Sequence, residues 1–180
     1  MPESSTPIDP LQFRQALGRF ASGVTVITVR HDGFTHGMTA NAFISVSLNP
    51  PLVLVSVNHK AQMHRLLPHS SRFGVSVLSD DQENLSNLFA GRGVEKQAFT
   101  FATRDGIPLL EGALAHLIVR LVDAHAAGDH TLYIGEVEYL DWQDGNPLLF
   151  FAGKYRQIKT EVPILTPWPE DEFWWFSTEF

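Results

Sequence analysis

The stretch from Gly37 to Val57 combines two apolar, strand-like runs with small polar side chains where a packed core would favour valine. The hydroxyl and amide side chains of its first run are Thr39, Asn41, Ser45 and Ser47. This pattern suggests a ligand that lies against the backbone and bonds to polar side chains. The same stretch also fits an ordinary strand, a loop and an edge strand, because Pro50 and Pro51 cannot donate ladder hydrogen bonds.

Other catalytic patterns are missing from the sequence. The chain has no cysteine, which excludes disulfides, thiolate catalysis and cysteine-held iron–sulfur clusters, so electron chemistry needs a bound or co-substrate cofactor. The Gly91-Arg92-Gly93 run lacks the third glycine of a dinucleotide-binding turn. His59, His64 and His69 are spaced by five residues, which favours surface or loop histidines over metal ligands. The sequence contains no Gly-x-Ser-x-Gly elbow, so it does not indicate a hydrolase.

The N-terminal part predicts one amphipathic helix that opens the fold. Asp9 fits the N-cap, and Pro10 fits the first helical position, where its missing N–H costs nothing. Apolar residues recur at near-helical spacing from Leu11 to Ala21, and Gly23 fits the C-cap.

Strand patterns dominate the remaining chain. Expected strands cover residues 24–30, 34–39, 52–57, 73–78, 113–123, 131–140 and 148–151. Short connecting helices are expected at residues 61–67 and 81–90. On strand 113–123, alternate apolar residues should face the core, with His116 and Arg120 on the other face. Antiparallel strands joined by short turns, without alternating βαβ units, predict a closed or nearly closed barrel.

Length and charge limit the class of protein. The 180 residues fit a single domain, and a net charge of −7 argues against a nucleic-acid partner. Local basic groups, Arg92 to Lys96 and Lys154-Tyr155-Arg156, could still bind one phosphate. No apolar run approaches the roughly 20 residues that span a bilayer. The N-terminus lacks a secretory signal, so we expect a cytoplasmic protein without a membrane partner.

Three segments resemble the short-chain flavin reductase family, the reductase components of two-component flavin-dependent monooxygenases. They are the stretch from Gly37 to Val57, the Gly128-Asp129-His130 group and the run from Phe151 to Tyr155. The resemblance covers roughly Phe13 to Ile158. It implies a mainly β fold with a few helices, an FMN-binding split β-barrel of antiparallel Greek-key type, over residues 1–159.

The resemblance also implies a flavin site, for FMN or FAD. Residues expected beside the flavin ring are Met38, Thr39, Ala40, Asn41, Ala42, Ser45, Val46 and Ser47. Residues expected on the phosphate side are Ser56, Val57, Asn58, Lys60, Ala61, Phe89, Ala90 and Arg92. The run from Asn58 to Met63 departs from the serine- and threonine-rich family pattern. The positive charge of Lys60 can bind the phosphate in place of those hydroxyl groups.

NADH or NADPH is the implied hydride donor. Residues expected to seat it are Asp129, His130, Phe151, Gly153, Lys154 and Tyr155, with His130 the catalytic residue beside the flavin. Direct hydride transfer demands stacking at near-contact distance and no strong acid or base. A lone Gly-Asp-His also fits a tight turn whose aspartate caps the loop.

The implied activity is a flavin reductase that supplies reduced flavin to a partner monooxygenase and forms a homodimer. Two alternatives stay open, a flavin-retaining oxidase or oxygenase related to pyridoxamine phosphate oxidases and a flavin-binding module without turnover. Residues 160–180 form an aromatic, proline-rich extension beyond the resemblance. We expect these aromatic side chains to pack on the domain or on a second subunit.

Overall fold

The computed structural model describes residues 7–93 and 98–158. The expected packing of the aromatic extension, residues 160–180, therefore lies outside the described residues. So does the basic end of the Arg92 to Lys96 group.

A seven-stranded antiparallel sheet forms the body of the protein. Its strand order is β3-β2-β6-β9-β10-β5-β4. The strands are β2 (Thr25–His31), β3 (Phe34–Ala40), β4 (Phe43–Leu48), β5 (Pro51–Asn58), β6 (Arg72–Val77), β9 (Ala115–Ala127) and β10 (His130–Trp142). The expected strands of this sheet are thus confirmed, with boundaries shifted by a few residues. β9 and β10 are each longer than predicted.

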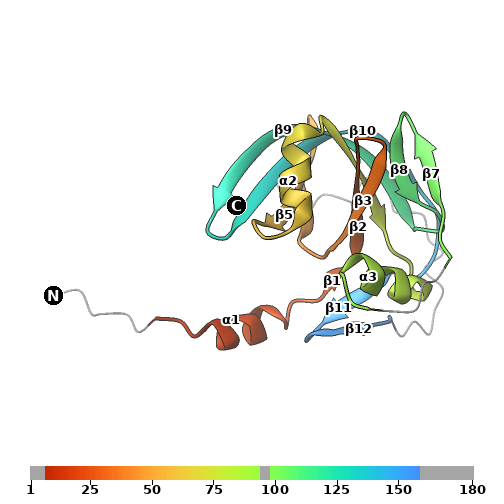
Figure 1. The fold of residues 1–180 in the computed structure, drawn as a ribbon. Helices are drawn as coiled ribbons and strands as arrows, with labels where there is room; N and C mark the ends of the chain where they lie inside the picture. Colours follow the sequence, from red (N-terminus) through yellow and green to blue (C-terminus); the bar gives the residue numbers. More distant parts are fainter. Residues whose placement is uncertain (1–6, 94–97, 159–180) are drawn as a thin grey trace.

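The sheet curls until its two ends approach each other (Figure 1). One buried cluster contains Val29 and Ala40 from the first strands of the order together with Val53 and Val57 from the last. The two edge strands, β3 and β4, are joined directly through Asn41 and Ala42. Among the described residues no ladder joins β3 to β4, so the sheet is a curved barrel that is not fully closed. The mainly β, antiparallel fold predicted from the sequence is confirmed.

Two smaller sheets complete the fold. One contains β1 (Ser22–Gly23), β11 (Leu149–Phe151) and β12 (Lys154–Arg156), and the other is the hairpin of β7 (Phe101–Arg104) and β8 (Ile107–Leu110). The sequence analysis missed the β7–β8 hairpin and β12, and it gave no strand range for β1 or β4. The Asp105-Gly106 pair is the signal for the hairpin, since both residues adopt the positive φ that a tight turn requires.

Two short helical segments pack against the sheet. α2 (Gln62–Leu66) continues into η1 (Leu67–His69) and buries Met63 and Leu67 in the main core. η2 (Asp80–Gln82) leads into α3 (Glu83–Phe89), which begins after a capping box between Ser79 and Gln82. Both expected connecting helices are confirmed. Within the described residues, no helix is long and apolar enough to cross a membrane.

The N-terminal helix α1 (Pro10–Leu17) differs from its prediction. Its start is confirmed, because the Asp9 carboxylate accepts from the backbone N–H groups of Leu11 and Gln12. Its end was predicted too far along the chain, since Gly18 and not Gly23 is the C-cap. No residue of α1 is buried, and the helix stands away from the barrel (Figure 1). The apolar side chains that predicted a core-facing helix remain exposed, as the chain itself offers α1 no packing partner among the described residues.

Candidate functional site

The Gly128-Asp129-His130 group forms the tip of the long β9–β10 hairpin. Gly128 and Asp129 make a two-residue turn, and His130 pairs with Ala127 across it. Gly128 has a φ of 62°, a value that glycine adopts without the steric cost met by other residues. The turn therefore places the His130 side chain at the first residue of β10.

The Asp129 carboxylate orients His130. Nδ1 of His130 lies 2.7 Å from Oδ1 of Asp129, and a carboxylate can only accept, so Nδ1 carries a proton. The hydrogen bond from His130 lowers the pKa of Asp129 below its ordinary value. The turn thus presents an ionised aspartate, and among the described residues Nε2 of His130 has no hydrogen-bond partner.

Asn58, at the end of β5, connects this tip to the segment expected to bind phosphate. Its Nδ2 donates to Asp129 Oδ2 at 3.3 Å, and its Oδ1 accepts from the backbone N–H of Lys60 at 2.9 Å. The backbone N–H of His59 also donates to the carbonyl of Asp129 at 3.0 Å. Two segments that lie about seventy positions apart in the sequence therefore form one hydrogen-bonded unit.

Two histidines support this unit from the side of α2, a role the sequence analysis did not predict. His59 Nε2 lies 3.1 Å from Thr131 Oγ1, and His64 Nδ1 lies 2.7 Å from the Tyr133 hydroxyl. The two imidazole rings are 4.8 Å apart. The alternation of side chains along β10 puts Thr131 and Tyr133 on one face, and this pattern could have indicated that both bond to the same neighbouring segment.

The residues expected beside the flavin ring divide between the core and the surface. Ala40 is buried and Met38 packs against the same core, so these two offer a ligand mainly backbone atoms; Val57, expected on the phosphate side, is buried as well. The exposed members are Asn41, Ala42, Ser45 and Val46. Between Ser45 and Ser47 the ladder with β5 shifts register, which marks a bulge at Val46. A bulge leaves main-chain groups unpaired.

A second group of expected residues surrounds α3. Thr39 donates to the carbonyl of Ser86 at 2.7 Å, and the Ser86 hydroxyl lies 2.8 Å from that of Tyr155. The Phe89 ring fills the space above Gly37, where an added Cβ would lie 2.6 Å from it. Arg92 donates to Asn87 Oδ1 at 3.2 Å. β3, α3 and β12 are therefore tied together at this end of the barrel.

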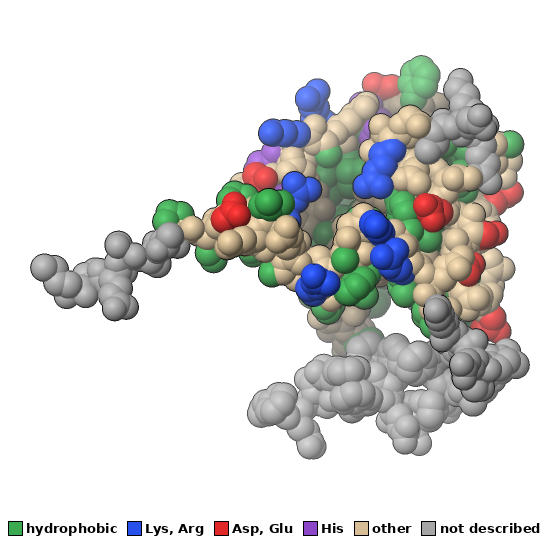
Figure 2. All heavy atoms as spheres, turned by 90° about the horizontal axis from the view of Figure 1, so that it is seen from below, with side chains coloured by type: hydrophobic (Ala, Val, Ile, Leu, Met, Phe, Trp, Pro, Cys, Tyr) green, Lys and Arg blue, Asp and Glu red, His purple; other side chains and the backbone are tan. Residues whose placement is uncertain are grey.

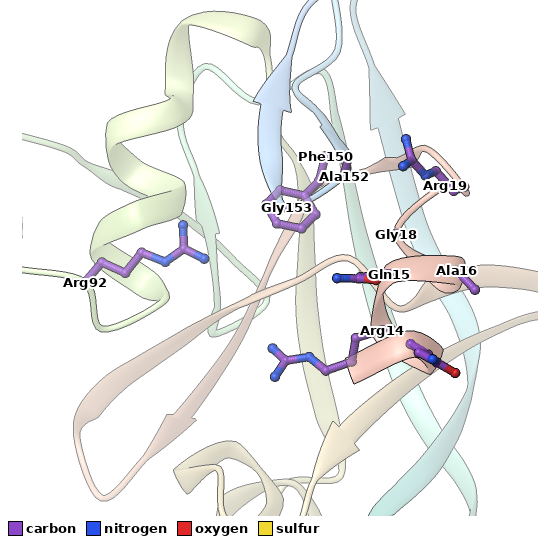
Figure 3. Close-up of a pocket in the computed structure, with 10 residues that line it drawn as sticks. Arg14, Gln15, Ala16, Gly18, Arg19, Arg92, Phe150, Ala152 and Gly153 are labelled. Carbon is purple, nitrogen blue, oxygen red and sulfur yellow. The ribbon is translucent and has the colours of Figure 1, made fainter. Parts of the chain in front are cut away.

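Arg92 also lines a cavity of about 850 Å³ with residues of α1 and of the turn between β11 and β12. The lining includes Arg92, which the sequence analysis assigned to the flavin phosphate, and Gly153, which it assigned to NADH or NADPH. Ala152, between the two short strands, also lines the cavity. Arg14 and Arg19 line it as well (Figure 3). The sequence analysis did not name these two residues as candidates.

The structure thus gathers six of the expected site residues into two groups. Asn58, Asp129 and His130 form one, and Thr39, Tyr155 and Arg92 belong to the other. Within the parts of the chain that the structure describes, no hydrogen bond or ion pair joins the two groups.

Comparisons with known proteins identify the family of this chain. Residues 17–159 match the profile of the flavin reductase-like domain family. An NADH-dependent flavin reductase from a Rhodococcus species is 49% identical over 160 residues, covering 87% of this chain and 91% of the relative. The reductase component of a 4-nitrophenol monooxygenase from Rhodococcus opacus is 37% identical, covering 83% of this chain and 81% of the relative.

Solved structures show the same fold. The flavin reductase PheA2 superposes with a TM-score of 0.82 at 48% sequence identity, covering 85% of this chain and all of that one. The resemblance found in the sequence is therefore confirmed, and this chain belongs to the flavin reductase-like domain family.

Proposed function

We propose that this protein oxidises NADH and reduces FMN or FAD, and that the reduced flavin passes to a partner monooxygenase. The observation that carries the proposal is the hydrogen-bonded unit of Asn58, Asp129 and His130 in a chain of this family. The unit places the residues expected for the nicotinamide next to a segment expected for the flavin phosphate. The relatives described as NADH-dependent and as a monooxygenase component support the donor and the partner.

The residues around Asn41 fit a flavin ring. Asn41 and Ala42 at the strand connection and Ser45 and Val46 on β4 are exposed, and they combine apolar surface with amide and hydroxyl groups. The bulge at Val46 adds main-chain groups that can bond the polar edge of a ring. A flavin bound there would supply the hydride acceptor of the reaction.

The chain itself contributes orientation and electrostatics. Asp129 holds the imidazole of His130 through Nδ1, so Nε2 can bond the carboxamide or ribose of the donor. Donors near Asn41 would stabilise the negative charge that develops on the acceptor. Because hydride transfer is direct, alignment of the two rings supplies most of the rate, and no side chain needs to move a proton in that step.

We also propose a homodimer. Exposed apolar side chains gather on α1 and on the edge strand β4, where Phe13 is 54% exposed, Leu17 57% and Ile44 56%. Apolar patches of this kind commonly mark interfaces. Val46, two positions after Ile44 on β4, is also exposed, so a second subunit on this strand would border a residue expected to bind the flavin.

The experiment that tests the proposed function is a nicotinamide oxidation assay. Purified protein is mixed with NADH or NADPH, and with FMN, FAD or no flavin, while the near-ultraviolet absorbance of the nicotinamide is followed. We expect decay with NADH that needs added flavin and saturates with it. Absence of decay despite measured flavin binding would refute the reductase and favour a flavin-binding module or an oxidase of another substrate.

A further inference from the structure

Ser86 of α3 is not among the residues expected to bind a ligand, yet it contacts two of them. The residue is fully buried, with 0% of its surface exposed. Its carbonyl oxygen accepts from Thr39 Oγ1 at 2.7 Å, and its hydroxyl lies 2.8 Å from the hydroxyl of Tyr155. Ser86 is therefore bonded to one residue expected beside the flavin and to one expected to seat NADH.

The structure around Ser86 fixes its position. α3 follows the capping box of Ser79 and Gln82, and its Leu85 is buried in a core cluster. The Ser86 carbonyl also accepts from the backbone N–H of Ala90 at 3.0 Å, within the helix. The serine hydroxyl is thus presented from a packed helix and offers a fixed hydrogen-bond partner.

The side chain of Tyr155 depends on that partner. Tyr155 belongs to β12, a strand of three residues that pairs only with β11 in the part of the chain that the structure describes. Its ring packs edge-to-face on Phe150 at 5.5 Å, which is a contact within the same hairpin. A phenol ring can turn about its side-chain bonds unless its hydroxyl is held. The bond to Ser86 supplies that constraint from another element.

Tyr155 lies at an end of the barrel suited to an anionic substrate. In Figure 1 this end carries α1, α3 and β12, and Figure 2 shows Lys and Arg side chains gathered around a hollow next to α1 on the same face. The guanidinium of Arg92 lies 6.0 Å from the centre of the Tyr155 ring. A positive surface of this kind attracts anions although the whole chain has a net charge of −7.

We propose that Ser86 is a positioning residue for the nicotinamide substrate. Its hydroxyl holds that of Tyr155, and its carbonyl bonds Thr39 of β3. One residue of α3 therefore sets the orientation of a side chain that meets the donor relative to the strand that meets the flavin. The inference rests on the proposed function, because it requires Tyr155 to contact the donor.

Calorimetry with NAD⁺ tests the proposal without turnover. The full-length protein is saturated with FMN, and NAD⁺ serves as a donor analogue that cannot give up a hydride. We expect Ser86→Ala to weaken NAD⁺ binding about three- to tenfold, the effect of one hydrogen bond, and to change the Kd for FMN less than about twofold. Unchanged NAD⁺ affinity in Ser86→Ala would overturn the proposal.

Ser76→Ala is the matched control for general loosening of the fold. Ser76 of β6 is equally buried, and its hydroxyl accepts from the N–H of Leu110 at 3.0 Å, outside every expected site. Its removal should lower the urea midpoint and leave the NAD⁺ affinity unchanged. A comparable loss of NAD⁺ affinity in Ser76→Ala and Ser86→Ala would make the effect structural and refute the positioning role.

A double-mutant cycle tests whether Ser86 acts through Tyr155. Tyr155→Phe removes the other hydroxyl from a partly buried residue and keeps the ring. The double variant should bind NAD⁺ no more weakly than the weaker single variant, whereas additive losses would contradict the proposal.

The proposed function and the role of Ser86 fail separately. Oxidation of NADH by a protein whose Ser86→Ala variant binds NAD⁺ normally would uphold the reductase and refute the role of Ser86. Binding of NAD⁺ that weakens as expected in Ser86→Ala, without any oxidation of NADH, would refute the reductase and support the positioning role. Absence of NAD⁺ binding by the unmodified protein would overturn the proposal.

Discussion

Asn58 and Asp129 are joined side chain to side chain at 3.3 Å, between the end of β5 and the turn before β10. The same Asn58 side chain accepts from the N–H of Lys60, so one amide holds both turns. The orientation of His130 thereby depends on a residue of the segment expected to bind phosphate. This coupling makes Asn58 a positioning residue.

Asn58→Ala should weaken the binding of both substrates, NADH and flavin. Loss of the two hydrogen bonds loosens both turns, so we expect KM for NADH and for flavin to rise about three- to tenfold with kcat retained. Steady-state kinetics with each substrate varied measure this. Asn84→Ala, an exposed asparagine of α3, is the control. A loss of kcat with both KM values unchanged would contradict the positioning role.

His130→Ala should affect the nicotinamide more than the flavin. We expect kcat/KM for NADH to fall about tenfold or more, because Nε2 no longer bonds the donor, while the flavin Kd changes less than about threefold. His125→Ala, which alters an exposed histidine paired with Asp123 on the same hairpin, should leave both values unchanged. Equal losses of nicotinamide turnover and flavin affinity would refute the role assigned to His130.

The proposed homodimer depends on the apolar face of α1. Leu17→Ser should shift the protein from dimer to monomer in sedimentation velocity runs, because it places a hydroxyl in an apolar interface. Phe34→Ser is the control, since Phe34 is 79% exposed at the β2–β3 turn. A monomeric unmodified protein, or the same dimer in Leu17→Ser and Phe34→Ser, would count against this interface.

Stability should decrease in mild acid through His36. Partial burial lowers the pKa of His36 below its ordinary value, so the unfolded chain binds this proton more tightly than the folded one. The free energy of unfolding therefore falls as pH drops through about 6.5, the unfolded pKa, and levels off below the folded pKa.

Urea unfolding at about pH 8 and about pH 5 measures this effect. In His36→Gln the difference between the two pH values should be smaller than in the unmodified protein. His69→Gln, which alters an exposed histidine, should keep the original difference. Identical pH differences in His36→Gln and unmodified protein would exclude the contribution of His36.

Gly74→Ala should destabilise the barrel. An added Cβ on β6 would lie 2.5 Å from Thr28 Oγ1 and 2.7 Å from the carbonyl oxygen of Pro108, and the latter belongs to the backbone of β8. We expect a loss of about 1–3 kcal/mol or more in the free energy of unfolding. Gly23→Ala, where no atom lies within 4 Å of the new Cβ, is the control in the same urea titration. Equal unfolding midpoints would contradict the steric argument.

Local patterns predicted the parts of the fold whose cause is local. The Asp9 cap and the strand of Pro51–Asn58 each follow from side chains a few positions apart. The C-terminal end of α1, at Gly18, could not be predicted in the same way. An apolar stripe from Leu11 to Ala21 predicts a helix that packs on a core, and whether a core lies beside it depends on the rest of the molecule.

The sequence by itself determined the antiparallel β class, the family resemblance and the identities of the expected site residues. Only the tertiary structure decided which of them meet. Asn58 reaches Asp129 because β5 and β10 are neighbours, and Arg14 faces Arg92 because Gly18 is bonded to the β11–β12 turn. Hydrogen bonds between strands and turns that are distant in the chain depend on how the whole sheet curls. The spacing of residues a few positions apart does not predict that curvature.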